Sequence, residues 1–152
     1  MTMRLTSAGF THGSEIPAHF TCDGGNLSPP LAWSGAPPGT RSFAIICRDP
    51  DAPSGAWYHW AAFDIPRSAD TLEEHVSPSS ATIRQAINDF GKRGYGGPCP
   101  PHGHGPHHYH FALYALGVEH LEAPASARCR DVEKAAKAHA LATAELIGLY
   151  AR

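Results

Sequence analysis

The sequence lacks the features of membrane-spanning, exported and nucleic-acid-binding proteins. No segment approaches the roughly 18 apolar residues of a membrane span, and the first residues, MTMRLTSAGF, contain no apolar stretch of a signal peptide. Twelve Lys and Arg stand against 14 Asp and Glu, so no positive excess attracts nucleic acid or an anionic membrane. We therefore expect a cytoplasmic protein in which any anion site is local.

Cysteine is scarce, and its spacing is not that of a metal or redox motif. Cys22, Cys47, Cys99 and Cys129 lie far apart and form no C-x-x-C pair. Without an export signal this spacing favours free thiols, so we predict that all four are reduced. A G-x-S-x-G elbow is missing too, and Cys99 lies between two prolines with no helix N-terminus to activate it. These absences disfavour a serine or thiol hydrolase.

Glycine and proline are abundant and fall in clusters between apolar runs. Fifteen Gly and 14 Pro among 152 residues exceed ordinary usage, which indicates a loop-rich β protein. The length suits one domain with a real core, and the chain has no internal repeat or linker-like change of composition. We predict a single domain over residues 1–152.

Three apolar runs predict strands, and a fourth pattern predicts a helix. Residues 43–47 form a continuous apolar run, typical of a strand buried on both faces. Residues 57–66 and 107–116 alternate with period two, which would place His59 on one face with Ala61 and Phe63. From Asp131 to Tyr150, apolar residues recur at spacings of three and four, so we predict a C-terminal amphipathic helix.

Two segments could carry chemistry. In RDPDAPSG, prolines restrict the backbone around Asp49 and Asp51, although a plain polar corner explains this pattern as well. The loop from Gly94 to Gly105 leads into His107 and Tyr109, where free backbone N–H groups, an imidazole and a hydroxyl would suit phosphate or carboxylate oxygens. The bland alternative is a surface loop whose histidines face water.

The histidine-rich stretch also admits a metal-site interpretation. Its potential ligands lie within twelve residues: Cys99, His102, His104, His107, His108 and His110. Structural zinc usually takes two ligand pairs from separate elements, and no second pair of Cys or His completes a tetrahedron here. We expect no metal and no other cofactor.

Several linked motifs resemble the phosphatidylethanolamine-binding protein family, in its bacterial Raf kinase inhibitor-like branch. They run in order from about Phe10 to the C-terminus: DGGNLSPPLAW, PPGTRSFAIICRDPDAP, WYHWAAFDIP, YGGPCPPHGHGPHHYHFALYAL and HALATAELIGLYAR. The resemblance implies a mainly β fold: a large central antiparallel sheet packed on a smaller sheet in a Greek-key type sandwich, with helices, including the C-terminal one, on the other side.

The resemblance also implies an anion pocket at the end of the central sheet. Its ligand-binding residues would be Asp49, Trp57, His59, Pro100, Pro101, Gly103, His107 and Tyr109. Asp49 would orient a histidine rather than meet the ligand, and Trp57 would be a wall. Of the five histidines in residues 97–117, only His107 matches a family pocket position, so we take the others as additions. Relatives of the branch often carry a lysine where this chain has His102.

We therefore expect a binding protein for a small anion, a phosphate- or carboxylate-bearing ligand such as a lipid headgroup, that modulates a kinase or protease partner. No apolar tunnel for acyl chains is evident, so a soluble headgroup is the narrower expectation. The chain is shorter than eukaryotic relatives between Pro53 and Trp57, so their kinase-regulating surfaces do not transfer. Alternatives are a histidine-dependent phosphate-ester enzyme and a His-rich metal-binding protein. The resemblance also implies a homodimer, because bacterial relatives are often dimeric, and the exposed-looking aromatics Tyr58 and Trp60 favour one as well.

Overall fold

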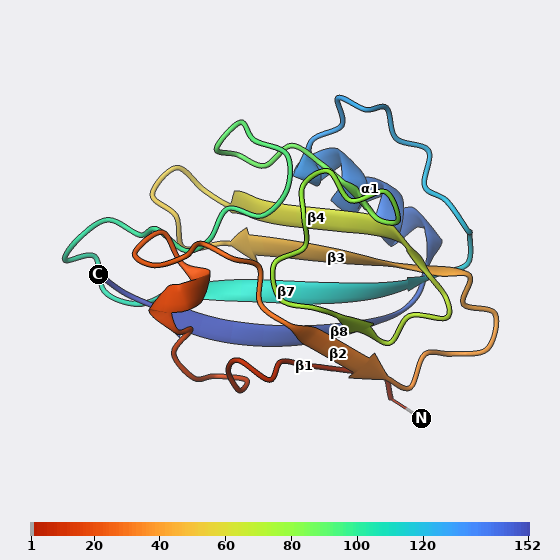
Figure 1. The fold of residues 1–152 in the computed structure, drawn as a ribbon, viewed down its shortest axis with the longest axis horizontal. Helices are drawn as coiled ribbons and strands as arrows, with labels where there is room; N and C mark the ends of the chain where they lie inside the picture. Colours follow the sequence, from red (N-terminus) through yellow and green to blue (C-terminus); the bar gives the residue numbers. More distant parts are fainter. Residues whose placement is uncertain (1) are drawn as a thin grey trace.

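The computed structural model describes residues 2–152 and consists of two antiparallel sheets and one α-helix (Figure 1). The large sheet has the order β6-β4-β3-β7-β8, and the small sheet has the order β1-β2-β5. The bounds are β1 Arg4–Thr6, η1 Ala18–Phe20, β2 Leu31–Ser34, β3 Ser42–Asp49, β4 Trp57–Pro66, β5 Thr71–Leu72, β6 Arg84–Gln85, β7 His107–Leu116, α1 Cys129–His139 and β8 Ala140–Tyr150. The mainly β sandwich predicted from the sequence is confirmed.

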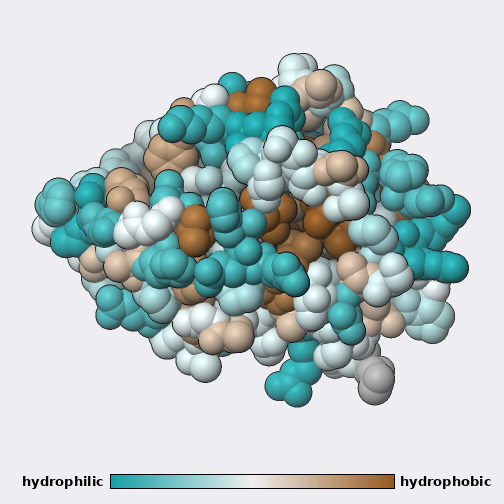
Figure 2. Space-filling model, viewed as in Figure 1, coloured by the Kyte–Doolittle hydropathy of each residue, from teal (hydrophilic) through white to brown (hydrophobic). Residues whose placement is uncertain are grey.

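The strand β3 lies in the middle of the large sheet and is buried on both faces, as its apolar run predicts. Phe43, Ile45 and Cys47 belong to the core between the two sheets. Ala44 and Ile46 belong to a second core, between the large sheet and α1. Figure 2 shows a largely hydrophilic face with apolar side chains gathered in a hollow near its middle.

The strand β4 does not keep the strict alternation that the sequence predicts. Its register against β3 shifts where Cys47 pairs with Trp60 and Arg48 pairs with Tyr58, which leaves His59 as an extra residue. This β-bulge reverses which face the following side chains point to. Ala61 and Phe63 point toward α1, whereas the His59 ring packs on Tyr109, which belongs to the core between the sheets. The prediction that His59 shares a face with Ala61 and Phe63 is therefore wrong.

The predicted C-terminal helix is correct up to His139 and wrong beyond it. Helix α1 ends at His139, and residues 140–150 form the strand β8, which pairs antiparallel with β7 along its whole length. Residues 140–145 alternate between half-buried and exposed side chains, which is the period of a strand. Alanine favours a helix in isolation, but the backbone groups of β7 require a pairing strand, and this tertiary requirement overrides the local propensity.

The predicted reduced state of the cysteines is wrong for two of the four. Cys22 and Cys99 form a disulfide with a Cα–Cα distance of 5.4 Å, whereas Cys47 and Cys129 are free and buried. Burial raises the pKa of the Cys129 thiol to about 12, so this thiol stays protonated.

Two aromatics that favoured a homodimer are buried within one chain. Trp60 donates its indole N–H to Gln85, and Tyr58 donates its hydroxyl to Glu133 of α1 at 2.6 Å. This basis for a dimer is therefore wrong, and the homodimer itself stays a prediction. Within residues 2–152, no helix is long and apolar enough to cross a membrane.

Candidate functional site

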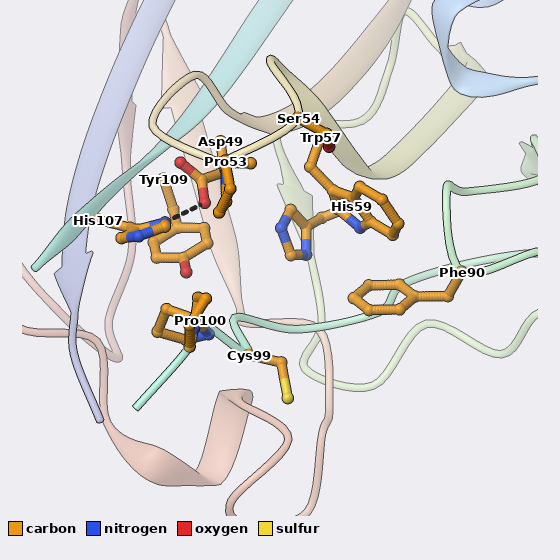
Figure 3. A pocket seen from close by; sticks show the side chains of 12 residues that line it. Asp49, Pro53, Ser54, Trp57, His59, Phe90, Cys99, Pro100, His107 and Tyr109 are labelled. Carbon is orange, nitrogen blue, oxygen red and sulfur yellow. Dashed lines mark hydrogen bonds and ion pairs between the residues drawn. The ribbon is translucent and has the colours of Figure 1, made fainter. Parts of the chain in front are cut away.

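A cavity of ≈ 270 Å³ opens at one end of the large sheet, where the strand β3 ends and the neighbouring strands β4 and β7 begin (Figure 3). Asp49 is the last residue of β3, Trp57 and His59 open β4, and His107 and Tyr109 open β7. Antiparallel pairing brings these strand ends together, and residues 52–54, Phe90 and residues 99–101 form the remaining walls.

Three side chains form a hydrogen-bonded chain along one wall of the cavity. The carboxylate of Asp49 accepts a hydrogen bond from Nδ1–H of His107 at 2.6 Å, and both side chains are buried. Nε2 of His107 lies 2.6 Å from Nδ1 of His104. The other carboxylate oxygen of Asp49 accepts the backbone N–H of Asp51 at 2.8 Å. Protein groups therefore occupy both ring nitrogens of His107 and both oxygens of Asp49.

His59, the bulged residue of β4, lies on the opposite wall. Its Nδ1–H donates to the backbone carbonyl of Gly96 at 2.6 Å, since a carbonyl can only accept. Burial lowers the pKa of this imidazole, although the hydrogen bond to Gly96 and the charge of Asp49 oppose that change. His59 is therefore neutral near pH 7, with Nδ1 protonated and Nε2 an acceptor.

Two hydrogen-bond donors in the cavity have no partner within the described chain. They are the hydroxyl of Tyr109, whose side chain is fully buried, and the indole N–H of Trp57. Burial and the nearby charge of Asp49 raise the pKa of the Tyr109 hydroxyl, which therefore keeps its proton and remains a donor. Figure 3 shows the Tyr109 hydroxyl pointing into the space between His107 and Pro100.

The rest of the wall is apolar, and part of it was not predicted. Phe90 packs edge-on against Trp57 and His59 with ring centroids 5.4 Å apart, and it is 43% exposed at the mouth. Ala52, Pro53, Ser54 and Cys99 also line the cavity. Phe90 lies in the NDFG turn after β6, where no periodic pattern indicates its direction.

The loop 94–105 is tied to two distant parts of the chain. Tyr95 donates its hydroxyl to the carbonyl of Phe20 at 2.7 Å, and the N–H of Gly97 donates to the Asn26 side chain at 2.8 Å. A Cβ on Gly97 would lie 2.3 Å from the Phe20 carbonyl oxygen, so this approach requires glycine. Arg152 donates through Nε to the Pro100 carbonyl at 2.8 Å, and the Cys22–Cys99 disulfide adds a covalent tie.

Seven of the eight predicted ligand-binding residues line this cavity, and the exception is Gly103. Gly103 is exposed, and its N–H donates to the carbonyl of Arg152 at 2.9 Å, so this amide is not free for a ligand. Whether the seven bind a ligand stays a prediction. His104, taken as an addition, contacts His107 directly. Within residues 2–152, no group of three or more His, Cys, Asp or Glu side chains could hold a metal ion.

Comparison with known proteins finds chains that are similar in sequence and in structure. A "UPF0098 protein" of Aquifex aeolicus is 48% identical over 152 residues, covering 99% of this chain and 89% of its own. The crystal structure of Escherichia coli YbcL, described as a new member of the mammalian PEBP family, superposes with a TM-score of 0.94 at 35% identity, covering 100% of this chain and 99% of its own.

A second solved structure agrees with the first. The homologue CT736 of Chlamydia trachomatis superposes with a TM-score of 0.88 at 35% identity, covering 99% of this chain and 98% of its own. The sequence pattern described as phosphatidylethanolamine-binding protein matches residues 6–151 of this chain. The predicted family is therefore confirmed, and the chain belongs to the phosphatidylethanolamine-binding protein family.

Proposed function

We propose that the cavity is a binding site for a small anion with a phosphate or carboxylate group. The observation that carries this proposal is the buried hydroxyl of Tyr109, which has no partner within the described chain and faces the cavity. Leaving a buried donor unpaired costs about 1–3 kcal/mol, a cost that an oxyanion would remove by accepting its hydrogen bond. Trp57 offers a second free donor in the same space.

The cavity suits the polar head of a ligand better than a long apolar chain. Its volume, ≈ 270 Å³, lies below the range of about 300–1,000 Å³ for drug-sized ligands. A whole lipid therefore does not fit, whereas a phosphate-bearing headgroup does. The proposal also includes modulation of a kinase or protease partner.

Binding fits this cavity better than catalysis. Cys99 is in a disulfide and is therefore no nucleophile. Ser54 lies on the exposed turn, and in the described part of the chain no hydrogen bond joins it to a histidine. Nucleophilic catalysis on a phosphate ester needs a nucleophile within hydrogen-bond reach of its base.

Thermal unfolding with and without ligand tests this function. Inorganic phosphate or O-phosphoethanolamine should raise the melting temperature, because a ligand at 100 times its Kd stabilises the folded state by about 2.7 kcal/mol. Tyr109→Phe should lose most of this protection without a lower melting temperature for the free protein, since its hydroxyl has no partner to lose.

Tyr114→Phe is the matched control, because Tyr114 lies on the same strand β7 but outside the cavity. This variant should respond to the ligands as the natural chain does. If the natural chain shows no protection by either ligand, or if Tyr109→Phe is protected as fully as Tyr114→Phe, the cavity is not the anion site.

A further inference from the structure

Some hydrogen-bonding groups on the walls of the cavity are free to meet a ligand, and others are already bound by protein groups. Two neutral donors are free, the Tyr109 hydroxyl and the Trp57 N–H. His107 also faces the cavity, but Asp49 and His104 occupy its two ring nitrogens at 2.6 Å each. Asp49 likewise has both oxygens bound, to His107 and to the backbone of Asp51. Within the described chain, the wall therefore holds no lysine or arginine and no histidine with a free N–H.

His59 contributes an acceptor rather than a donor. Its Nδ1–H is committed to the Gly96 carbonyl at 2.6 Å, so the neutral ring presents a lone pair at Nε2. Figure 3 shows the ring between Trp57 and Tyr109, with one nitrogen toward the cavity. An oxyanion whose oxygens all carry lone pairs would meet this nitrogen as acceptor against acceptor, which is repulsive unless a proton lies between them.

We propose that the cavity selects oxyanions that carry their own hydroxyl, namely inorganic phosphate or a singly protonated phosphate monoester, over sulfate and over phosphodiesters. The ligand O–H would donate to Nε2 of His59, while Tyr109 and Trp57 would donate to its unprotonated oxygens. This inference rests on the proposed function and adds to it the class of ligand.

The proposal distinguishes two sources of a phosphate group, the headgroup of an intact phospholipid and a free phosphate compound. The headgroup of an intact phospholipid is a phosphodiester, which has no P–O–H at any pH near neutrality. O-phosphoethanolamine is a monoester and keeps a P–O–H below its second ionisation, near about pH 6. Glycerophosphoethanolamine has the same phosphate and ethanolamine groups without that hydroxyl. We therefore expect this chain to favour free phosphate compounds over phospholipid headgroups.

Proton linkage follows from the groups around His59. The charged groups that influence it are Asp49 at the end of β3 and Asp89 in the turn 88–91, while Tyr109 of β7 packs on the ring. Burial is the largest influence and keeps the imidazole neutral near pH 7. Sulfate can therefore bind well only when His59 takes up a proton and becomes a donor, whereas phosphate brings the proton with it.

Isothermal titration calorimetry with inorganic phosphate and sulfate tests the inference. At about pH 8, inorganic phosphate is mainly a dianion, with the charge of sulfate and one O–H that sulfate lacks. Phosphate should bind at least tenfold tighter there. Sulfate should gain up to tenfold per unit as pH falls toward about 6, with proton uptake measured in two buffers of different ionisation enthalpy. At about pH 6, where O-phosphoethanolamine keeps much of its P–O–H, it should bind tighter than glycerophosphoethanolamine, whose affinity should rise with proton uptake as that of sulfate does.

Two variants separate selection from binding. His59→Gln supplies an amide that can donate or accept, so it should bind phosphate and sulfate within a factor of about three of each other. His108→Gln is the control, because His108 pairs with Asp51 outside the cavity, and it should keep the natural preference.

The outcomes distinguish the two proposals. If phosphate and sulfate bind equally tightly at all pH values, the selection is wrong and the anion site stands. Glycerophosphoethanolamine that binds as tightly as O-phosphoethanolamine at about pH 6 without proton uptake would likewise overturn the selection. If none of the four compounds binds, the anion site itself is wrong, and the selection with it.

Discussion

At the scale of single residues, the position of His59 depends on one inserted residue. The β-bulge at the start of β4 turns this imidazole toward Tyr109 and away from the face that holds Ala61 and Phe63. Its carbonyl partner, Gly96, comes from a loop 37 residues further along the chain. Period-two reasoning cannot detect such an insertion, because a bulge leaves no mark on residue types and only shifts their register.

The buried, neutral state of His59 predicts a pH dependence of stability. Its pKa is lower in the folded than in the unfolded chain, where it is about 6.5, so the unfolded state binds more protons between these two values. The free energy of unfolding should therefore fall as pH drops below about 6.5, by at most about 1.4 kcal/mol per unit from this residue. Above that pH, His59 makes its full contribution to the free energy of unfolding.

Urea unfolding of the natural chain and of His59→Gln at several pH values between about 5 and 8 measures this contribution. The variant should show a smaller loss toward acid, because glutamine does not titrate. Identical slopes for the natural chain and His59→Gln would show that the imidazole is not held neutral in the folded state.

At the scale of elements, the sequence predicts what local periodicity encodes and misses what distant partners decide. The predicted strands at residues 43–47, 57–66 and 107–116 lie within or match β3, β4 and β7, since their apolar patterns face two real cores. The segment from Ala140 to Tyr150 has helix-compatible spacing, yet it pairs with β7. Its state depends on an edge that no window of its own residues reveals.

The disulfide was also not predicted, because it too depends on partners that are distant in the sequence. Cys22 and Cys99 are 77 residues apart, and only the folded loops bring them together. Disulfides persist mainly in oxidising compartments, so this bond does not support the expected cytoplasmic location, which stays a prediction. The family motifs, by contrast, predicted seven of the residues that line the cavity, because the resemblance carries positions that periodicity cannot place.

The disulfide should contribute measurably to stability. Cys22→Ser and Cys99→Ser should each lower the free energy of unfolding by about 2–5 kcal/mol, the usual cost of losing a native disulfide. The double variant should lose no more than either single variant, because both remove the same bond. Thermal unfolding with a dithiol reductant provides the check: it should lower the melting temperature of the natural chain and leave the variants unchanged. A natural chain insensitive to reductant after full reduction would contradict this role.

At the scale of the whole molecule, the two cores support a site at the end of the central strand that they share. The core between the sheets and the core under α1 both pack on β3, which fixes the central strand on its two faces. The cavity lies where that strand ends, and its walls come from segments far apart in sequence. Rigid strands therefore position Asp49, His59 and His107, while tied loops close the cavity around them.

Hydrogen exchange followed by mass spectrometry tests this arrangement across the chain. Inorganic phosphate at saturation should slow amide exchange together in the segments 49–57, 88–101 and 107–109, and in 18–27, which is tied to the loop by the disulfide and by hydrogen bonds from Tyr95 and Gly97. Helix α1 contributes no residue to the cavity and should show no change. A larger hollow of ≈ 580 Å³, lined by residues 2–7, 10–12 and 143–146, is the rival location. Within residues 2–152, no buried side-chain N or O atom that lines this hollow lacks a hydrogen-bond partner, so we expect no protection there. Protection confined to that hollow would place the anion outside the site built by β3, β4 and β7.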